Sequence, residues 1–116
     1  MSQSADIRLI YITTDGVAEA KAIGRALVEA RLAACVNILD PMISMYWWDG
    51  AVREGRETVL IAKTVAAKVE ALTEKVRTLH SYDCPCVVSV PIDGGNSAFL
   101  DWIAAETGGP LPGEPA

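Results

Sequence analysis

Residues 34–63 have the sequence ACVNILDPMISMYWWDGAVREGRETVLIAK, and this stretch predicts one long β-hairpin. Asp49-Gly50 marks the turn, because a two-residue type I′ turn needs positive φ at both positions, which this pair tolerates. Each arm has about 14 residues and would extend ~45 Å, whereas a compact chain of this length is only roughly 35 Å across. The hairpin is therefore expected to project beyond the body that carries it.

The tip of this hairpin is apolar and aromatic, with Tyr46, Trp47 and Trp48 directly before the turn. A projecting apolar arm on a small protein is an aggregation hazard unless a partner covers it. The simplest partner is another copy of the same chain, so we expect a homo-oligomer.

Length and composition indicate one domain. The chain has 116 residues, of which 51% are hydrophobic and 22% charged, so one packed core is expected. We expect a single domain over residues 1–107 and a flexible Gly/Pro tail over 108–116. The net charge is −5 and the ten Lys and Arg are scattered, which argues against nucleic-acid binding.

The same data indicate a location. No apolar run is long enough to span a membrane, and the first residues do not resemble an export signal. The three cysteines, an odd number, fit reduced thiols better than a disulfide framework. We therefore expect a cytoplasmic protein.

The segment before the hairpin predicts a strand and a helix. Residues 7–13 are apolar and β-branched, which is typical of a buried strand. Thr14 and Asp15 offer N-cap oxygens for a helix over 17–31. Gly24 lies on the apolar stripe of that helix, where we expect it to allow close packing against a sheet. Pro41, in the first hairpin arm, is expected at a bulge or a sheet edge.

The segment after the hairpin repeats this pattern. Thr64 is expected to cap a helix over 65–79, a turn-rich loop follows at 80–85, and 86–92 predict a fourth strand with Pro91 at an edge. A short helix is expected from Asn96 or Ser97. The order β-α-β-β-α-β plus a helix predicts an α+β, ferredoxin-like sandwich with a four-stranded antiparallel sheet.

This fold leaves one sheet face and a long edge uncovered within a monomer. Head-to-tail pairing of sheet edges closes into a ring, and a threefold ring is a compact solution. The sequence therefore favours a homotrimer.

The residues favour binding over catalysis. There is one His, and there is no GxSxG, P-loop or GxGxxG motif. His80, Cys84 and Cys86 form an H-x3-C-x-C pattern, and Cys35 lies on a predicted strand. Thiolate and imidazole suit copper(I) and zinc, and Cys84 and Cys86 would share a face if both lay in the fourth strand. Equally, His80 could stabilise a helix end and the cysteines could be small core residues.

Several polar residues on the hairpin leave two interpretations open. Glu57 and Lys63 share a strand face with Val59 and Ile61, so they either line a site or lie at a solvated sheet margin. Cys35 is expected to be a core residue. Tyr82 and Asp83, in the loop before Pro85, are either turn formers or site residues.

Five segments in order resemble the CutA (CutA1) divalent-cation tolerance family across roughly residues 7–106. They are AACVNI at 33–38, YWWDG at 46–50, Glu57 with LIAKT at 60–64, H-x-Y-x-x-P at 80–85 and FLDWI at 99–103. The resemblance implies a ferredoxin-like, PII-like fold and a homotrimer whose hairpins pair between subunits. It also implies a link to tolerance of copper and other divalent cations, with copper binding by some members.

The resemblance also implies candidate sites. His80 and Cys35 fall on the family's own His and Cys, whereas Cys86 replaces a Glu and Cys84 an apolar residue, which would make a metal site softer. The candidate metal ligands are thus His80, Cys35, Cys84 and Cys86. The residues that match the family's intersubunit cleft are Trp48, Glu57, Lys63, Tyr82 and Asp83. The alternative function is a PII-like signalling module that binds a small anionic ligand in that cleft.

Overall fold

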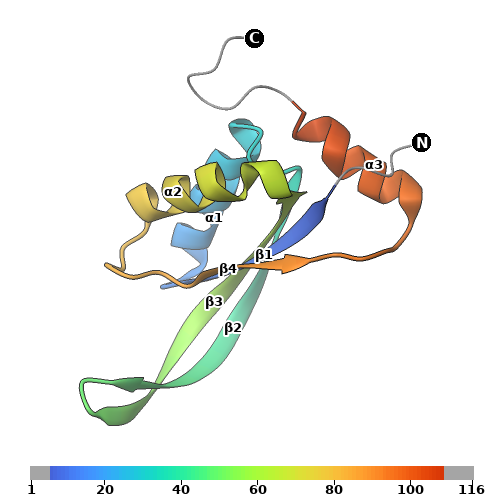
Figure 1. Ribbon diagram of the computed structural model, residues 1–116. Coiled ribbons are helices and arrows are strands. Elements are labelled where there is room, and N and C mark those ends of the chain that lie inside the picture. The colour runs from blue at the N-terminus through green and yellow to red at the C-terminus, as the bar shows by residue number, and fades with distance from the viewer. Residues whose placement is uncertain (1–5, 109–116) are drawn as a thin grey trace.

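The computed structural model describes residues 6–108 and consists of one sheet, two helices packed on it and a third helix at its end (Figure 1). The four strands are antiparallel and lie in the order β2-β3-β1-β4. The elements are β1 (Ile7–Thr14), α1 (Val17–Glu29), β2 (Cys35–Trp48), β3 (Ala51–Val65), the 3₁₀ helix η1 (Ala66–Lys68), α2 (Val69–Leu79), β4 (Val87–Pro91) and α3 (Ser97–Glu106). The predicted ferredoxin-like fold is confirmed.

The long hairpin is also confirmed. Its turn has φ of 52° at Asp49 and 80° at Gly50, as a type I′ turn requires. The β2–β3 arm gives the molecule a long axis of 50 Å, and its tip projects away from both helices (Figure 1). The β2–β3 register shifts between Leu39 and Met42, beside Pro41, and β2 is an edge strand, so both expectations for this proline are met.

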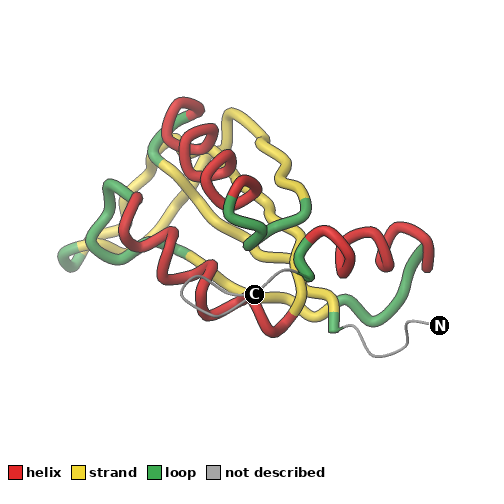
Figure 2. The backbone as a smooth tube through the Cα atoms, turned by 90° about the horizontal axis from the view of Figure 1, so that it is seen from above, coloured by secondary structure: helices red, strands yellow, loops and turns green. Residues whose placement is uncertain are grey.

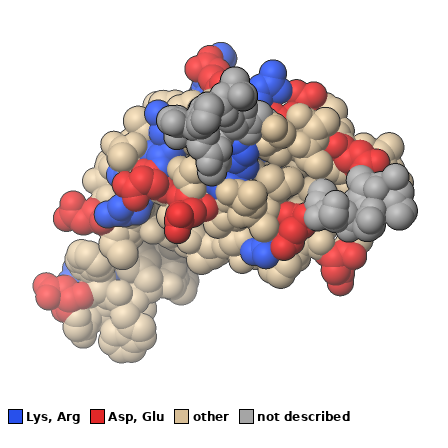
Figure 3. All heavy atoms as spheres, turned by 45° about the horizontal axis from the view of Figure 1, so that its top comes forward, with Lys and Arg blue, Asp and Glu red and all other residues tan. Residues whose placement is uncertain are grey.

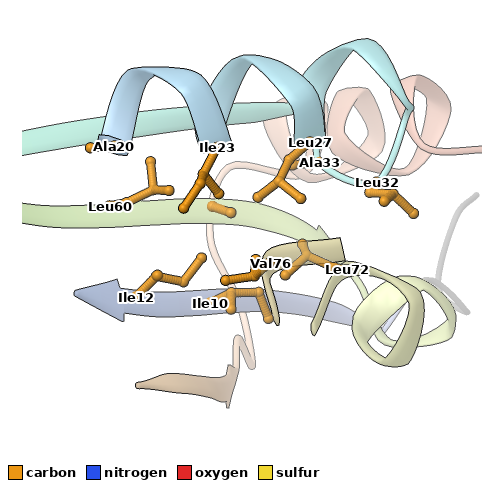
Figure 4. Close-up of a cluster of buried hydrophobic side chains, with 11 residues drawn as sticks. Ile10, Ile12, Ala20, Ile23, Leu27, Leu32, Ala33, Leu60, Leu72 and Val76 are labelled. Carbon is orange, nitrogen blue, oxygen red and sulfur yellow. The ribbon is translucent and has the colours of Figure 1, made fainter. Parts of the chain in front are cut away.

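The core lies between one sheet face and the helices α1 and α2. Ile10 and Ile12 of β1 and Leu60 of β3 point toward α1 and α2, whose Leu27, Leu72 and Val76 meet them (Figure 4). Gly24 allows this approach, because a Cβ there would lie 3.0 Å from Val36 Cγ2 and 3.2 Å from Leu60 Cδ1. The predicted role of Gly24 in close packing is confirmed.

The other sheet face carries no helix. Residues of β3 alternate, so Leu60 and Ala62 face the core while Glu57, Val59, Ile61 and Lys63 lie on the helix-free face. Cys35 is paired with Lys63 and lies on this face as well, half-buried, whereas Val36 packs against the core. The expectation that Cys35 is a core residue of the monomer is therefore wrong.

Two predicted helix caps are wrong for one reason, although α1 begins at Val17 as predicted. Gly16 is the N-cap of α1, because the Thr14 hydroxyl donates instead to the carbonyls of Gly16 and Thr58, each at 3.1 Å. Thr64 does not cap α2 but is buried in β3 opposite Arg8, and α2 begins at Val69 after η1. In both places the pairing of β1 with β3 includes the threonine that the sequence predicts as a helix cap.

The remaining boundaries differ only slightly from those predicted. α1 ends at Glu29, and Arg31 just beyond it has a φ of 61°. β4 is an edge strand over Val87–Pro91, shorter than the predicted 86–92, so Cys84 and Cys86 both precede it and the condition for a shared strand face is not met.

The third helix begins where the sequence predicts. Asn96 Oδ1 accepts a hydrogen bond from the Ala98 amide at 3.2 Å and caps α3. Figure 2 shows α3 set apart from α1 and α2. Of the predicted tail, residues 109–116 lie outside the described part of the chain. Within residues 6–108, no helix has the length and apolar character needed to cross a membrane.

Gly24→Val tests the close contact between α1 and the sheet. A side chain there would push Val36 and Leu60 out of place, so we expect the free energy of unfolding to fall by about 1–3 kcal/mol in urea titrations. Gly94→Val is the control, because nothing lies within 4 Å of a Cβ at that position. Equal stability of the two variants would show that this packing is not tight.

Candidate functional site

The polar residues gather around Glu57, on the helix-free face where the arm leaves the body. Glu57 Oε1 accepts a hydrogen bond from Ser44 Oγ at 2.6 Å, and Oε2 accepts one from the Tyr82 hydroxyl at 3.1 Å. Ser44 belongs to β2 and Tyr82 to the loop after α2. The carboxylate therefore joins the arm to a loop that follows it by 25 residues.

His80 holds that loop in place. Its imidazole has no exposed surface, and Nε2 lies 2.8 Å from the Thr13 carbonyl oxygen while Nδ1 lies 3.1 Å from the Tyr82 amide nitrogen. A carbonyl only accepts and an amide only donates, so the ring is neutral with its proton on Nε2. Both ring nitrogens are thus occupied, and His80 would have to give up a hydrogen bond to bind a metal ion.

Glu19 of α1 secures the same loop from the other side. Oε1 accepts from the Asp15 amide at 2.9 Å and Oε2 from the Ser81 amide at 2.8 Å. Burial raises the pKa of Glu19, but the hydrogen bonds from Asp15 and Ser81 outweigh it, so the pKa lies below its ordinary value. The carboxylate also lies 3.8 Å from His80 Nδ1.

The site is electrically negative. Burial, the hydrogen bond to Glu57 and the charges of Glu57, Asp15 and Glu19 raise the pKa of Tyr82 to about 12. Burial and the Glu57 charge also raise the pKa of the Cys86 thiol, although a hydrogen bond from Thr13 opposes them. Carboxylates that disfavour further negative charge favour a cation over an anion.

The structure brings together some of the predicted site residues. Glu57, Tyr82 and Cys86 lie in one cluster, whereas Trp48 is exposed at the arm tip and Lys63 donates a hydrogen bond to Asn37. Asp83 and Cys84 are exposed in the loop, and Cys35 lies beside Lys63. In the part of the chain that the structure describes, no three His, Cys, Asp or Glu side chains gather closely enough to hold a metal ion.

Sequence reasoning missed three contributors, namely Ser44, Met42 and Glu19. Ser44 and Met42 could have been found by counting outward from the Asp49-Gly50 turn, which pairs Met42 with Glu57 and places Ser44 two pairs nearer the tip, on the same face. Glu19 carried no signal, because its partners Asp15 and Ser81 meet only when α1 and the loop after α2 pack together.

The βαββαβ sandwich with a long β2–β3 arm and a polar cluster at the base of that arm places the chain in the class of ferredoxin-like, PII-like α+β proteins. Within that class, it belongs to the CutA1 divalent ion tolerance protein family, whose model matches residues 8–106.

Individual relatives agree with this assignment. The chain is 43% identical over 100 residues to the divalent-cation tolerance protein CutA of Thermus thermophilus, covering 86% of this chain and 97% of that one. A solved structure, the periplasmic divalent cation tolerance protein CutA of Archaeoglobus fulgidus, superposes with a TM-score of 0.84 at 40% identity, covering 87% and 98%. The CutA1 structure from Oryza sativa gives a TM-score of 0.87 at 37% identity, covering 90% and 96%.

Glu19→Gln tests how much the charge of Glu19, which binds the loop after α2, contributes to the stability of the fold. Because the folded-state pKa of Glu19 lies below its ordinary value of 4.5, its ionised form stabilises the fold above that pH, and the stabilisation is lost as pH falls through the folded-state pKa. We expect the variant to lose about 1–2 kcal/mol of unfolding free energy at neutral pH and less at an acid pH well below 4.5. The measurement is urea unfolding at both pH values.

Glu29→Gln is the matched control for this experiment. Glu29 lies on the same helix with its side chain 67% exposed, so its removal should change stability little at either pH. A loss for Glu19→Gln that is the same at both pH values would show that the Glu19 charge does not contribute.

Proposed function

We propose that the protein is a homotrimer that binds copper or another divalent metal ion and so supports tolerance to such ions. The observation that carries the metal-binding part is the cluster of carboxylates at the base of the arm, where Glu57 accepts a hydrogen bond from Tyr82 and Glu19 accepts one from the neighbouring Ser81. Such surroundings attract cations. Membership of the CutA1 divalent ion tolerance protein family supports a role for this binding in tolerance to metal ions.

Uncovered apolar surface supports the homotrimer. Trp47 and Trp48 at the arm tip are 75% and 67% exposed, and Ile43, Met45 and Val52 of the arm are exposed too. Leu39, Val88 and Val90 extend this apolar surface over the helix-free face. The sheet also ends in two edges, β2 and β4, and pairing β2 of one copy with β4 of the next closes a ring.

Free thiols supply suitable ligands. Cys35, Cys84 and Cys86 form no disulfide, and thiolates bind copper(I) and zinc well. They are the proposed ligands within the trimer, with His80 holding the loop that carries two of them. Since the three thiols do not gather in one chain with other ligands, a site that uses several of them would need more than one subunit.

A second candidate is binding of a small anionic ligand between subunits, as in a signalling module. Lys63, whose ammonium group contacts Asn37 on the helix-free face, supports this alternative. The carboxylates around Tyr82 oppose it, because they would repel an anion. Lys and Arg also lie among Asp and Glu on the face shown in Figure 3, so a nucleic-acid partner is not proposed.

We also propose a cytoplasmic location and a role in binding rather than catalysis. Free thiols persist in a reducing compartment, and all three cysteines here are unpaired. The Archaeoglobus fulgidus relative is described as periplasmic, so localisation of a tagged full chain in cell fractions is the direct check.

Replacing Trp47 and Trp48 together by Ser tests the role of the arm in assembly. If the arm tips pack against other copies, the variant should dissociate at protein concentrations where the wild type stays trimeric, and its melting temperature should become more dependent on concentration. Light scattering and melting curves over a dilution series measure both. Trp102→Ser is the control, because Trp102 is exposed on α3, away from the arm.

Copper(I) titration of the reduced protein against a competing chelator tests the metal-binding proposal. We expect saturable binding with a Kd of about 1 nM or lower, equivalent to roughly 12 kcal/mol, by a protein that remains trimeric in light scattering. Weak, non-saturating binding of copper(I), zinc and copper(II) by an intact trimer would refute it. A melting temperature raised by an anion without added metal would then favour the second candidate.

A further inference from the structure

An open groove lies between α1 and the edge strand β2, on the side of the sheet that carries the helices. Its volume is about 450 Å³, within the range of ~300–1,000 Å³ that is usual for small-molecule sites. Three aliphatic side chains line it, namely Val28 of α1, which is 37% exposed, and the half-buried Val36 and Ile38 of β2. The groove is separate from the cluster around Glu57, which lies on the opposite face of the sheet.

Two cations also line this groove. Lys21 and Arg25 are four residues apart on α1, so they are neighbours on one side of the helix, and like charges at this spacing repel each other. Within residues 6–108, Lys21 has no ion-pair partner, and Arg25 pairs only with Glu29, at 3.5 Å and with both side chains largely exposed. An anion between Lys21 and Arg25 would remove the repulsion, so this end of the groove complements negative charge although the chain has a net charge of −5.

The third charged residue of the groove fixes the direction in which a ligand would lie. Glu29 is eight residues after Lys21, about 12 Å along the helix axis at ~1.5 Å per residue. It would repel an anionic group at its own end of the groove. A ligand would therefore place its negative group near Lys21 and an uncharged part near Val28.

We propose that the groove between α1 and β2 binds a medium-chain fatty acid. The carboxylate would lie between Lys21 and Arg25, and the alkyl chain would cover the aliphatic side chains of the groove. Lys21 and Val28 are about 10 Å apart along the helix axis, which suits an alkyl chain of medium length. A wholly polar anion such as inorganic phosphate would leave the aliphatic surface in water, so it fits less well. This inference goes beyond the proposed metal binding and does not depend on it.

Titration calorimetry of the full chain with decanoate, in the presence of EDTA and below the concentration at which micelles form, tests the inference. We expect saturable binding of one decanoate per chain with a Kd in the micromolar range, and no measurable binding of acetate, which lacks the alkyl chain. Replacing Lys21 and Arg25 together by Gln should lower the affinity at least about tenfold, and Val28→Ser should lower it about threefold or more.

Two matched controls separate this groove from general attraction of anions. Replacing Lys75 and Arg77 together by Gln removes the same number of charges from the exposed surface of α2. Lys63→Gln removes a cation from the helix-free face. Neither control should change the affinity for decanoate, and melting curves check that every variant is folded.

Each of four results would overturn the inference. They are a wild type that does not bind decanoate, acetate that binds as tightly as decanoate, binding that survives the double replacement of Lys21 and Arg25, and an equal loss of affinity in either control. The first result would also be expected if a second copy of the chain covered the groove. The copper(I) titration is unaffected by any of them, so the two proposals stand or fall separately.

Discussion

The register between β2 and β3 is the constraint on which the rest of the structure depends. With Asp49-Gly50 at the turn, Trp48 pairs with Ala51 and every later pair follows, apart from the shift beside Pro41. This register sends Leu60 and Ala62 toward the helices and Glu57 to the other face. A slip by one residue would exchange the two faces, place the Glu57 carboxylate under a helix and expose Leu60.

The loop after α2 is organised by contacts that extend outward from this sheet. His80 bonds to the end of β1 and to Tyr82, and Tyr82 bonds to Glu57 at the base of the arm. Glu19 adds a bond from α1. Three elements, β1, β3 and α1, therefore hold the loop. They keep its polar groups close to the helix-free face. That face combines a negative cluster with exposed apolar residues, so ion binding and assembly are proposed for the same side of the sheet.

The sequence predicted the architecture well because its strongest signals are local. The Asp49-Gly50 turn, the Asn96 cap and the strand face shared by Glu57, Val59, Ile61 and Lys63 each depend on a few neighbouring residues, and each is confirmed. The predicted caps at Thr14 and Thr64 failed although they look similar in sequence. At both sites the antiparallel pairing of β1 with β3 offers the backbone more hydrogen bonds than a helix cap would, so the strands run on.

The candidate site was only partly visible in the sequence. Glu57, Tyr82 and Cys86 were found, but Trp48, Lys63 and Asp83 do not join them within one chain, and Met42, Ser44 and Glu19 were missed. By itself the sequence determined the order of the elements, the long arm and its apolar tip, because turn chemistry and hydrophobic periodicity act over a few residues. Only the tertiary structure decided which polar side chains meet and that both nitrogens of His80 are occupied. Those contacts join residues far apart in the chain, and they depend on how α1, the loop after α2 and the arm pack around one sheet.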